Sequence, residues 1–315
     1  MLASIIIPTY NHASVILSSL ETWTHQTMDS SDFEVIIVDN NSIDETATLV
    51  QTFIKPFPNF HYVLETKTGA TCARHRGAAI AKADILMFCD DDGLFNPSCI
   101  EEILKVYYLY PQVSAVAGKI NILWDEVPPE WIAPYEFMLG KLDYGDQIVT
   151  GKDLYLNGGL FSIRKQIFEQ LGGFNPDLIG SYQIGDGDTG LVNKLHEADM
   201  LIGWTPFAIM EHLQFVKRHG TVKDIGRRCY NAGIATAYAV FRKNDFHWNR
   251  TMTSYFIQTC LLFCKKFMEY GLHFSEKEAY FKYMKRKGEL TFFGNLRKKE
   301  IRKELLLEQR KRKGK

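Results

Sequence analysis

Short apolar runs rich in Ile and Val alternate with stretches of helical spacing along the first hundred residues of the chain. This alternation is typical of βαβ units, in which parallel strands form a sheet and helices cover its faces. Right-handed crossovers bring the carboxyl ends of the strands to one edge, where open α/β sheets bind their ligands. The pattern predicts strands at residues 3–8, 34–39, 60–64 and 84–89 and helices at residues 15–24, 44–53, 72–82 and 97–109.

Beyond residue 115 the pattern is less regular, and residues 121–151 show no clear period. From residue 222 almost to the end the spacing is helical. We expect an α/β domain over residues 1–220, with a mostly parallel central sheet flanked by helices, and a helical C-terminal extension with a basic tail over residues 221–315. Within the α/β domain the pattern predicts further strands at residues 113–122, 155–163 and 201–204 and helices at residues 164–171 and 187–198.

The charges are distributed unevenly, although 37 Lys/Arg and 37 Asp/Glu give a formal net charge of zero. From Lys282 to the end there are fourteen basic residues against four Glu, so the preceding residues carry ten excess negative charges. An acidic main domain argues against a nucleic-acid-binding face there. The basic tail suits an anionic lipid, a nucleic acid or an acidic partner, and a solvated, partly helical C-terminus remains the other interpretation.

The cysteines and the apolar segments bear on the compartment. Six cysteines without a CxxC pair indicate a reduced, intracellular environment. The N-terminus lacks a basic region and a cleavage site, which predicts no signal peptide. The most apolar late segment, residues 255–267, is interrupted by Gln258, Lys265 and Lys266 and falls short of the roughly 20 apolar residues that span a membrane. We expect a cytoplasmic protein, with peripheral contact at the inner face of the membrane through the basic tail.

Three consecutive aspartates, Asp90, Asp91 and Asp92, follow an apolar run at residues 85–88. Carboxylates at the end of a buried strand repel one another, so a cation is expected among them. Oxygen ligands favour Mg²⁺ or Mn²⁺, and such ions typically bridge a diphosphate when only one or two protein carboxylates bind them. An acidic turn that caps the next helix is the alternative, although a cap needs only one Asp.

Two strand-to-helix loops are expected side by side at the sheet edge. The first contains Pro8, Thr9, Tyr10 and Asn11, and the second runs from Asp39 through Asn41. Asp39 can accept a hydrogen bond from a base N–H, and Tyr10 offers a ring for stacking. The absence of a GxGxxG or Walker A sequence after the first strand argues against dinucleotide oxidoreductases and P-loop NTPases. Each loop alone is also ordinary turn chemistry.

Small residues surround two arginines at the start of the third predicted helix, between Gly69 and Gly77. They allow the backbone to approach a ligand closely, and Arg74 or Arg76 can then reach a phosphate or ribose. Packing alone also explains such a helix start.

Asp186 and Asp188 form a carboxylate pair at the mouth of another helix. A carboxylate held on a helix start can deprotonate an acceptor hydroxyl, whereas an N-cap would need only one of the two. His212 follows the last predicted strand of the domain. A lone His is usually structural, but an imidazole can also join carboxylates on Mn²⁺.

Taken in order, these motifs resemble those of glycosyltransferase family 2, whose members have the GT-A fold. The resemblance covers residues 3 to about 215 and implies a nucleotide-sugar half over residues 1–115 and an acceptor half over residues 116–220. It implies base contacts around Pro8, Thr9 and Asp39. It also implies that Asp90 lies near the ribose or donor sugar and that Asp92 binds the metal through a DxD motif. Asp188 takes the position of the catalytic base, and Gly187 stands where the family commonly has Glu, so Asp186 is expected to take part of the role of that Glu.

The resemblance implies an inverting, metal-dependent transfer from a nucleotide diphosphate-sugar, by family frequency a UDP-sugar, to the hydroxyl of a saccharide or lipid-linked acceptor. Cell-surface polysaccharide or glycolipid biosynthesis is the expected context, with no nucleic-acid partner. A non-catalytic nucleotide-sugar-binding protein is an alternative that Gly187 supports. A sugar-nucleotide pyrophosphorylase is a further alternative, but its Gly-rich N-terminal signature is absent.

Overall fold

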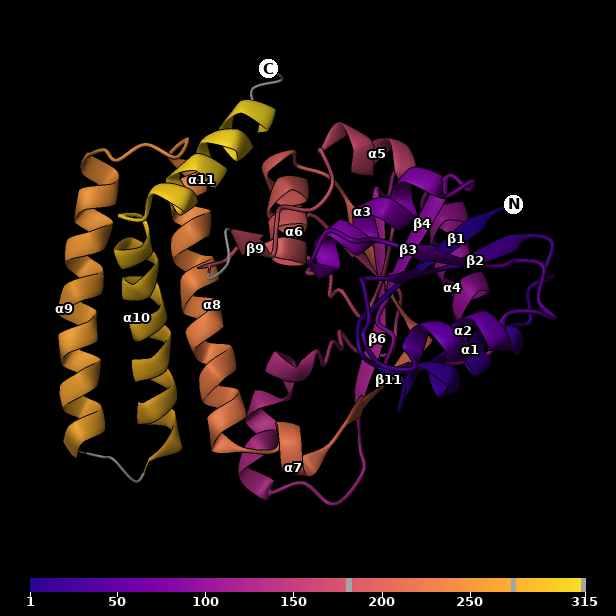
Figure 1. Ribbon diagram of the computed structural model, residues 1–315, viewed down its shortest axis with the longest axis horizontal. Helices are drawn as coiled ribbons and strands as arrows, with labels where there is room; N and C mark the ends of the chain where they lie inside the picture. Colours follow the sequence, from indigo (N-terminus) through magenta and orange to yellow (C-terminus); the bar gives the residue numbers. More distant parts are fainter. Residues whose placement is uncertain (180–182, 273–275, 313–315) are drawn as a thin grey trace. The chain divides into compact units, whose positions relative to one another are not determined.

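The structure is a computed structural model that describes residues 1–179, 183–272 and 276–312. It comprises an α/β unit, residues 1–174 and 188–214, and a helical unit, residues 175–187 and 215–315 (Figure 1). The helical unit therefore includes the short segment 175–187, which interrupts the α/β unit along the chain. The sequence predicted one uninterrupted α/β domain over residues 1–220 and did not indicate that residues 175–187 belong to the helical unit.

A nine-stranded sheet, counted over the described residues, forms the centre of the α/β unit, in the order β3-β2-β1-β4-β8-β6-β11-β5 with β7 beside β11. Ile and Val runs form the first strands because both faces of these strands are covered and buried. The strands are β1 (Ala3–Thr9), β2 (Phe33–Asp39), β3 (Phe60–Leu64), β4 (Ile85–Cys89), β5 (Gly93–Phe95), β6 (Ala115–Trp124), β7 (Val149–Gly151), β8 (Leu160–Arg164) and β11 (Ile202–Gln214).

The sheet is mostly parallel, as predicted, but three of its described strands run in the opposite direction. Strands β3, β2, β1 and β4 are mutually parallel, as predicted, and so are β6 and β11. Strand β8, however, runs antiparallel to both β4 and β6, and β5 and β7 run antiparallel to β11. Parallel neighbours need a crossover that returns the chain to the same end of the sheet. The segment between β6 and β8 does not return to the same end of the sheet, so β8 runs antiparallel to β6.

Alternate residues of β1 enter two separate cores. Ile5 and Ile7 pack in the core under α1, α2 and α4, whereas Ile6 packs in the core under α3, α5 and α6. Gly77 lets α3 approach β1, since an added Cβ would lie 2.4 Å from Ile6 Cγ2. The helices of this unit are α1 (Ile16–Thr24), α2 (Thr46–Phe53), α3 (Ala70–Ile80), α4 (Cys99–Leu109), α5 (Lys165–Gln170) and α6 (Gly187–Glu197), with a 3₁₀ helix η1 (Glu130–Leu139).

Two strands differ from the prediction. Strand β11 continues to Gln214 instead of ending at residue 204, because a shift of register between Thr205 and Ile209 carries the pairing with β6 past Pro206. Strand β8 begins at Leu160 rather than residue 155. The residues before it form a loop that contributes to the site described below.

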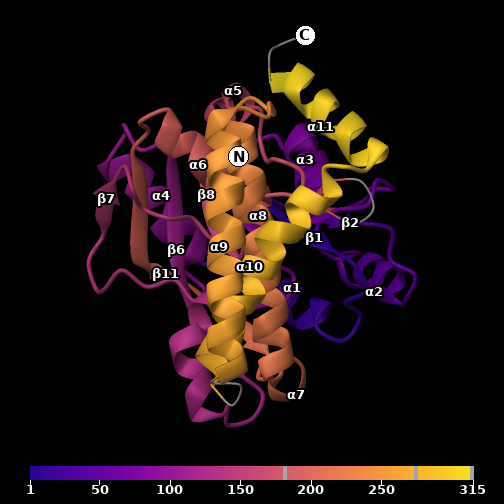
Figure 2. The same ribbon diagram turned by 90° about the vertical axis from the view of Figure 1, so that its left-hand side faces the viewer.

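Helix α10 packs between α8 and α9 in the helical unit (Figures 1 and 2). Gly233 and Gly288 allow α8 and α10 to touch, because a Cβ at either position would lie 2.0 Å from a backbone oxygen of the other helix. The helices are α7 (Val216–His219), α8 (Val222–Lys243), α9 (Arg250–Leu272), α10 (Lys277–Asn295) and α11 (Lys299–Arg312), with a short pair β9 (Leu178–Ile179) and β10 (Gln183–Ile184).

None of the helices in the described part of the chain combines the length and the apolar character needed to cross a membrane.

Candidate active site and metal centre

Long-range strand pairing positions the acidic loop that follows β4. The amide of Asp90 donates to the carbonyl of Gly159, at 3.2 Å, and the carbonyl of Asp92 accepts from the amide of Leu213, at 3.0 Å. Strand β5 then pairs with β11 so that Gly93 lies opposite His212. The loop is thus held between two strands that are distant in sequence.

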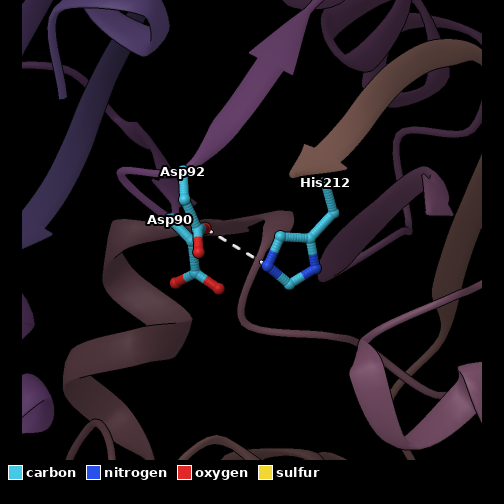
Figure 3. Close-up of side chains that lie close together, drawn as sticks. All are labelled: Asp90, Asp92 and His212. Atoms are coloured by element: carbon cyan, nitrogen blue, oxygen red, sulfur yellow. Dashed lines mark ion pairs between the residues drawn. The ribbon is translucent and has the colours of Figure 1, made fainter. Parts of the chain in front are cut away.

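Asp90, Asp92 and His212 point toward one another from this loop and from β11 (Figure 3). One ligand atom from each residue lies within 4.8 Å of the other two, and His212 Nε2 is 3.2 Å from Asp92 Oδ1. Burial alone would raise the pKa of Asp92, but the hydrogen bond from His212, together with the charges of His212 and His12, outweighs it and holds the pKa below its usual value. Burial raises the pKa of Asp90, and the neighbouring Arg74 only partly offsets this effect.

This group fits a divalent cation. Two carboxylates and an imidazole supply the oxygen and nitrogen donors that Mn²⁺ accepts, and the carboxylates also suit Mg²⁺. A cation would neutralise two carboxylates that otherwise repel each other. Gly140 keeps the space beside the imidazole open, since an added Cβ would lie 3.0 Å from His212 Nδ1.

The middle aspartate of the run has a different partner. Asp91 is buried, and its Oδ1 lies 2.8 Å from His12 Nδ1 in the loop after β1. The structure therefore ties Asp91 to the first loop instead of bringing it into the group of Asp90, Asp92 and His212. The sequence did not single out His12, although its position directly after Asn11 in a predicted ligand loop was a usable signal.

Arg74, not Arg76, enters the site. The Nη2 atom of Arg74 donates to Asp90 Oδ1 at 2.7 Å and to the carbonyl of Gly158 at 3.2 Å. Its guanidinium carbon lies 5.6 Å from the ring centre of Phe174, and the side chain is buried. Arg76, by contrast, is exposed on α3.

Asp188 lies in the first turn of α6 and, like Arg74, contacts Gly158 in the loop before β8. Its Oδ2 accepts from the amide of Gly158 at 3.1 Å, and its Oδ1 accepts from the amide of Thr189 at 2.8 Å. A Cβ added to Gly158 would lie 2.8 Å from Asp188 Oδ2 and 2.9 Å from Arg74 Nη2. Gly158, which the sequence did not indicate, therefore links Asp188 to the acidic loop through Arg74.

Asp186 and Asp188 belong to different units. Asp186 lies in the helical unit, almost fully buried, where it accepts a hydrogen bond from Asn175 Nδ2 at 2.8 Å. Its Oδ2 also lies 3.5 Å from Arg242 Nε on α8. The carboxylate of Asp186 is thus engaged in an interior ion pair, whereas Asp188 is directed to the loop before β8.

The loops after β1 and β2 are joined by hydrogen bonds. Asn11 donates from its amide to Ser42 Oγ at 2.9 Å and accepts from the amide of Ile43 at 2.8 Å. Asn11 and Asn41 have φ angles of 51° and 66°, a left-handed conformation that Asn adopts more readily than most residues. Tyr10 is 53% exposed beside them, so its ring is available for stacking.

Asp39 is buried at the end of β2. It accepts from the amide of Ser42 at 2.8 Å and from the hydroxyl of Tyr62 at 2.7 Å. Burial and the adjacent carboxylate raise the pKa of Tyr62 to about 12, so this hydroxyl stays protonated and keeps donating. A carboxylate offers roughly four acceptor positions, which leaves acceptor capacity on Asp39 for a ligand.

Asn40 forms hydrogen bonds to the loops that contain Thr9 and Gly69, two further residues of the predicted nucleotide site. Its amide donates to the carbonyl of Thr9 at 2.8 Å, just after Pro8 in β1. Its side-chain oxygen accepts from the amide of Gly69 at 2.7 Å. Gly69 has a φ of 129°, which a residue with a side chain rarely adopts. Asn40 thereby aligns three loops at one sheet edge.

Comparison with known proteins gives a consistent result. Residues 4–172 match the family model described as glycosyl transferase family 2. An uncharacterized glycosyltransferase of Haemophilus influenzae is 32% identical over 239 residues, which cover 75% of this chain and 74% of the relative. The O-antigen chain rhamnosyltransferase RfbN of Salmonella typhimurium is 23% identical over 78% of this chain and 76% of its own length.

Solved structures show the same fold. Staphylococcus aureus TarS superposes with a TM-score of 0.54 at 16% identity, over 80% of this chain and 44% of the TarS chain. GalNAc-T7, solved with UDP, GalNAc and Mn²⁺, gives a TM-score of 0.53 at 16% identity, over 68% of this chain and 43% of its own. The chain thus spans less than half the length of both structures.

Proposed function

Because the chain belongs to glycosyl transferase family 2, we propose that it transfers a sugar from a nucleotide diphosphate-sugar to an acceptor hydroxyl, with inversion at the anomeric carbon. One observation carries this proposal: Asp90, with Asp92 and His212 beside it, is connected to Asp188 through Arg74 and the backbone of Gly158. An acidic metal group and a fixed carboxylate are the two parts that such a transfer needs.

The donor is proposed to bind along the loops after β1, β2 and β3. Asp39 accepts a hydrogen bond from the base, and the exposed ring of Tyr10 stacks on it. Thr9, Asn11 and Asn41 shape the two loops, and Pro8 and Gly69 form their borders. The joined loops, with acceptor capacity left on Asp39, support this assignment.

The diphosphate is proposed to lie against Asp92, Asp90 and His212, which would hold a divalent cation. When bound there, Mn²⁺ or Mg²⁺ would stabilise the negative charge of the departing diphosphate. Arg74 adds a fixed positive charge next to Asp90, and Asp91 holds the loop through His12. The likeness to a structure that contains Mn²⁺ favours that ion, although the carboxylates also accept Mg²⁺.

Asp188 is proposed as the base that receives the proton of the acceptor hydroxyl while the oxygen attacks the anomeric carbon. Amide hydrogen bonds from Gly158 and Thr189 fix both carboxylate oxygens, and a fixed carboxylate needs little reorganisation during proton transfer. Asp186 remains a positioning residue in this proposal, because its carboxylate is already paired with Arg242 in the helical unit.

A UDP-sugar donor and a saccharide or lipid-linked acceptor complete the proposal, within cell-surface polysaccharide or glycolipid biosynthesis. The name of RfbN, an O-antigen chain rhamnosyltransferase, supports a saccharide acceptor, and the UDP in the GalNAc-T7 structure supports the base.

Thermal stabilisation by nucleoside diphosphates, with and without Mn²⁺, tests the donor site. We expect one nucleotide to raise the melting temperature in a metal-dependent way and Asp92→Asn to abolish the metal dependence. Asp199→Asn, on an exposed turn, is the matched control and should respond like the wild type. No shift with any nucleotide would refute the donor site, and retention of anomeric configuration in the product, read by proton NMR, would refute Asp188 as the base of an inverting transfer.

A further inference from the structure

Helix α9 carries a line of exposed apolar side chains on the face that points away from α10. The residues recur at intervals of three or four, which places them along one side of a helix. Single exposed apolar residues are common, but a line about 22 Å long is a continuous patch. Leu261, Met268 and Leu272 are 67%, 61% and 81% exposed. We call this patch the α9 stripe; its members are Ile257, Leu261, Cys264, Met268 and Leu272.

The opposite face of α9 packs inside the helical unit. Met252 is buried in the core of the helical unit. The ring of Phe256 lies 5.0 Å from that of Phe293 on α10, and Phe263 lies 5.6 Å from Tyr283 on the same helix. These contacts hold α9 against α10 and lie on the side of the helix away from the α9 stripe. The stripe is therefore apolar without serving the packing of α9 on α10.

The helical part of the chain is strongly basic. Residues 215–315 contain 25 Lys/Arg and 9 Asp/Glu, an excess of 16 positive charges, whereas residues 1–214 contain 12 Lys/Arg and 28 Asp/Glu. A basic side chain also borders the stripe. Lys265, which follows Cys264 directly, is exposed on α9.

We propose that the α9 stripe docks on an anionic lipid bilayer. In this arrangement α9 lies in the plane of the interface, with its apolar side chains at the boundary of the acyl chains and with Lys265 on lipid phosphates. An apolar helix face on a strongly basic part of a chain is the combination that binds such interfaces. This surface is distinct from the donor site, so the proposal goes beyond the transfer reaction.

The charge decides between a bilayer and other partners. A second copy of the chain would bring two surfaces of like charge together, which disfavours self-association through the stripe. A nucleic acid would satisfy the basic residues but offers little to a line of aliphatic side chains. A bilayer that contains anionic lipid satisfies both, and no helix among the described residues could insert across it.

Flotation of the full chain with vesicles tests the proposal. The vesicles are phosphatidylcholine alone or phosphatidylcholine with about one third phosphatidylglycerol. We expect binding only to the anionic vesicles, and we expect the double variant Leu261→Gln/Met268→Gln to lower the partition coefficient about tenfold or more. Gln is a good helix former, so this exposed change should leave α9 folded, which circular dichroism checks. The matched control is Tyr108→Gln/Leu109→Gln, which alters two exposed apolar residues on α4.

Each outcome decides the matter. Loss of vesicle binding in the α9 variant, with binding retained in the α4 variant, supports the proposal. Equal flotation of the wild type and the α9 variant overturns it, as does failure of the wild type to bind anionic vesicles. Two results would reassign the surface and also overturn the proposal: dimers in light scattering that the α9 variant abolishes, or binding of an RNA oligonucleotide in place of vesicles.

Discussion

Replacing Gly158 with Ala should slow the transfer reaction while leaving the fold intact. The added methyl group would lie 2.8 Å from Asp188 Oδ2 and 2.9 Å from Arg74 Nη2, against ordinary contacts of 3.4 Å or more. Each side chain must then move by about half an ångström, because neither atom can be compressed. Both atoms are the ends of side chains, so the backbone can stay in place and the free energy of unfolding should change little.

The expected cost in rate follows from this displacement. A misplacement of about 1 Å at a reacting group can reduce a rate about a hundredfold, so a shift of half that size predicts a loss of about ten- to a hundredfold in kcat. This range corresponds to roughly 1.4 to 2.7 kcal/mol of activation free energy. We expect a smaller change in the KM for the donor, because the nucleotide loops are untouched.

Steady-state transfer rates and thermal melting together check the prediction. Gly294→Ala is the matched control, since a Cβ at that position meets no atom within 4 Å and should leave the rate unchanged. A Gly158→Ala enzyme with wild-type kcat would refute the close approach of Asp188 and Arg74 and, with it, the proposed role of Asp188. A large loss of melting temperature would instead show that Gly158 acts through stability.

Three further predictions concern the supports of the site and the helical unit. His12→Ala removes the partner of the buried Asp91 carboxylate, so it should lower the free energy of unfolding by about 1 to 3 kcal/mol in a denaturant titration. It should also weaken Mn²⁺ binding in calorimetry, and His12→Gln should restore part of both properties. An unchanged Mn²⁺ affinity would contradict the positioning role of His12. Asp224→Asn should lower the melting temperature at neutral pH, because burial would raise the pKa of Asp224 but hydrogen bonds from Arg228 and Arg227 outweigh it and hold the pKa below 3.8. A group with a depressed pKa stabilises the folded state above its unfolded pKa. The difference from wild type should therefore begin to shrink as the pH falls below about 3.8 and vanish once the pH passes below the depressed folded pKa. A difference that does not change with pH would refute the ion-pair explanation. Gly288→Ala should destabilise the protein by about 1 to 3 kcal/mol or more, because its Cβ would lie 2.0 Å from the carbonyl oxygen of Tyr230; equal stability in urea would contradict the close approach of α8 and α10.

The sequence was informative where structure depends on neighbours along the chain. Strands β1, β2 and β4 could be predicted because a buried parallel strand needs a run such as Ile5 to Ile7, whatever lies beside it. The acidic run was equally visible, since three carboxylates after a buried strand need an explanation in any fold. The motif order identified the family, which the match over residues 4–172 confirms.

The side chains that meet across long separations were decided by the tertiary structure. His212 reaches Asp92 because β5 pairs with β11, and Asp91 turns to His12 because the first loop lies beside the acidic loop. Local spacing carries no record of which distant strands become neighbours. The sequence of the acidic run therefore could not show that Asp91 pairs with His12 and Asp92 with His212.

The same limit applies to the two acidic residues at the mouth of α6. By sequence alone both Asp186 and Asp188 were candidates, two positions apart at one helix start, with Asp188 preferred as the base. Only the folded chain directs Asp188 to the amide of Gly158 and buries Asp186 against Arg242, which lies 56 positions farther along the chain. The sequence determined which chemical groups the protein has and in which local elements they stand. Packing decided which of them meet, because a contact between distant residues depends on the whole fold around it.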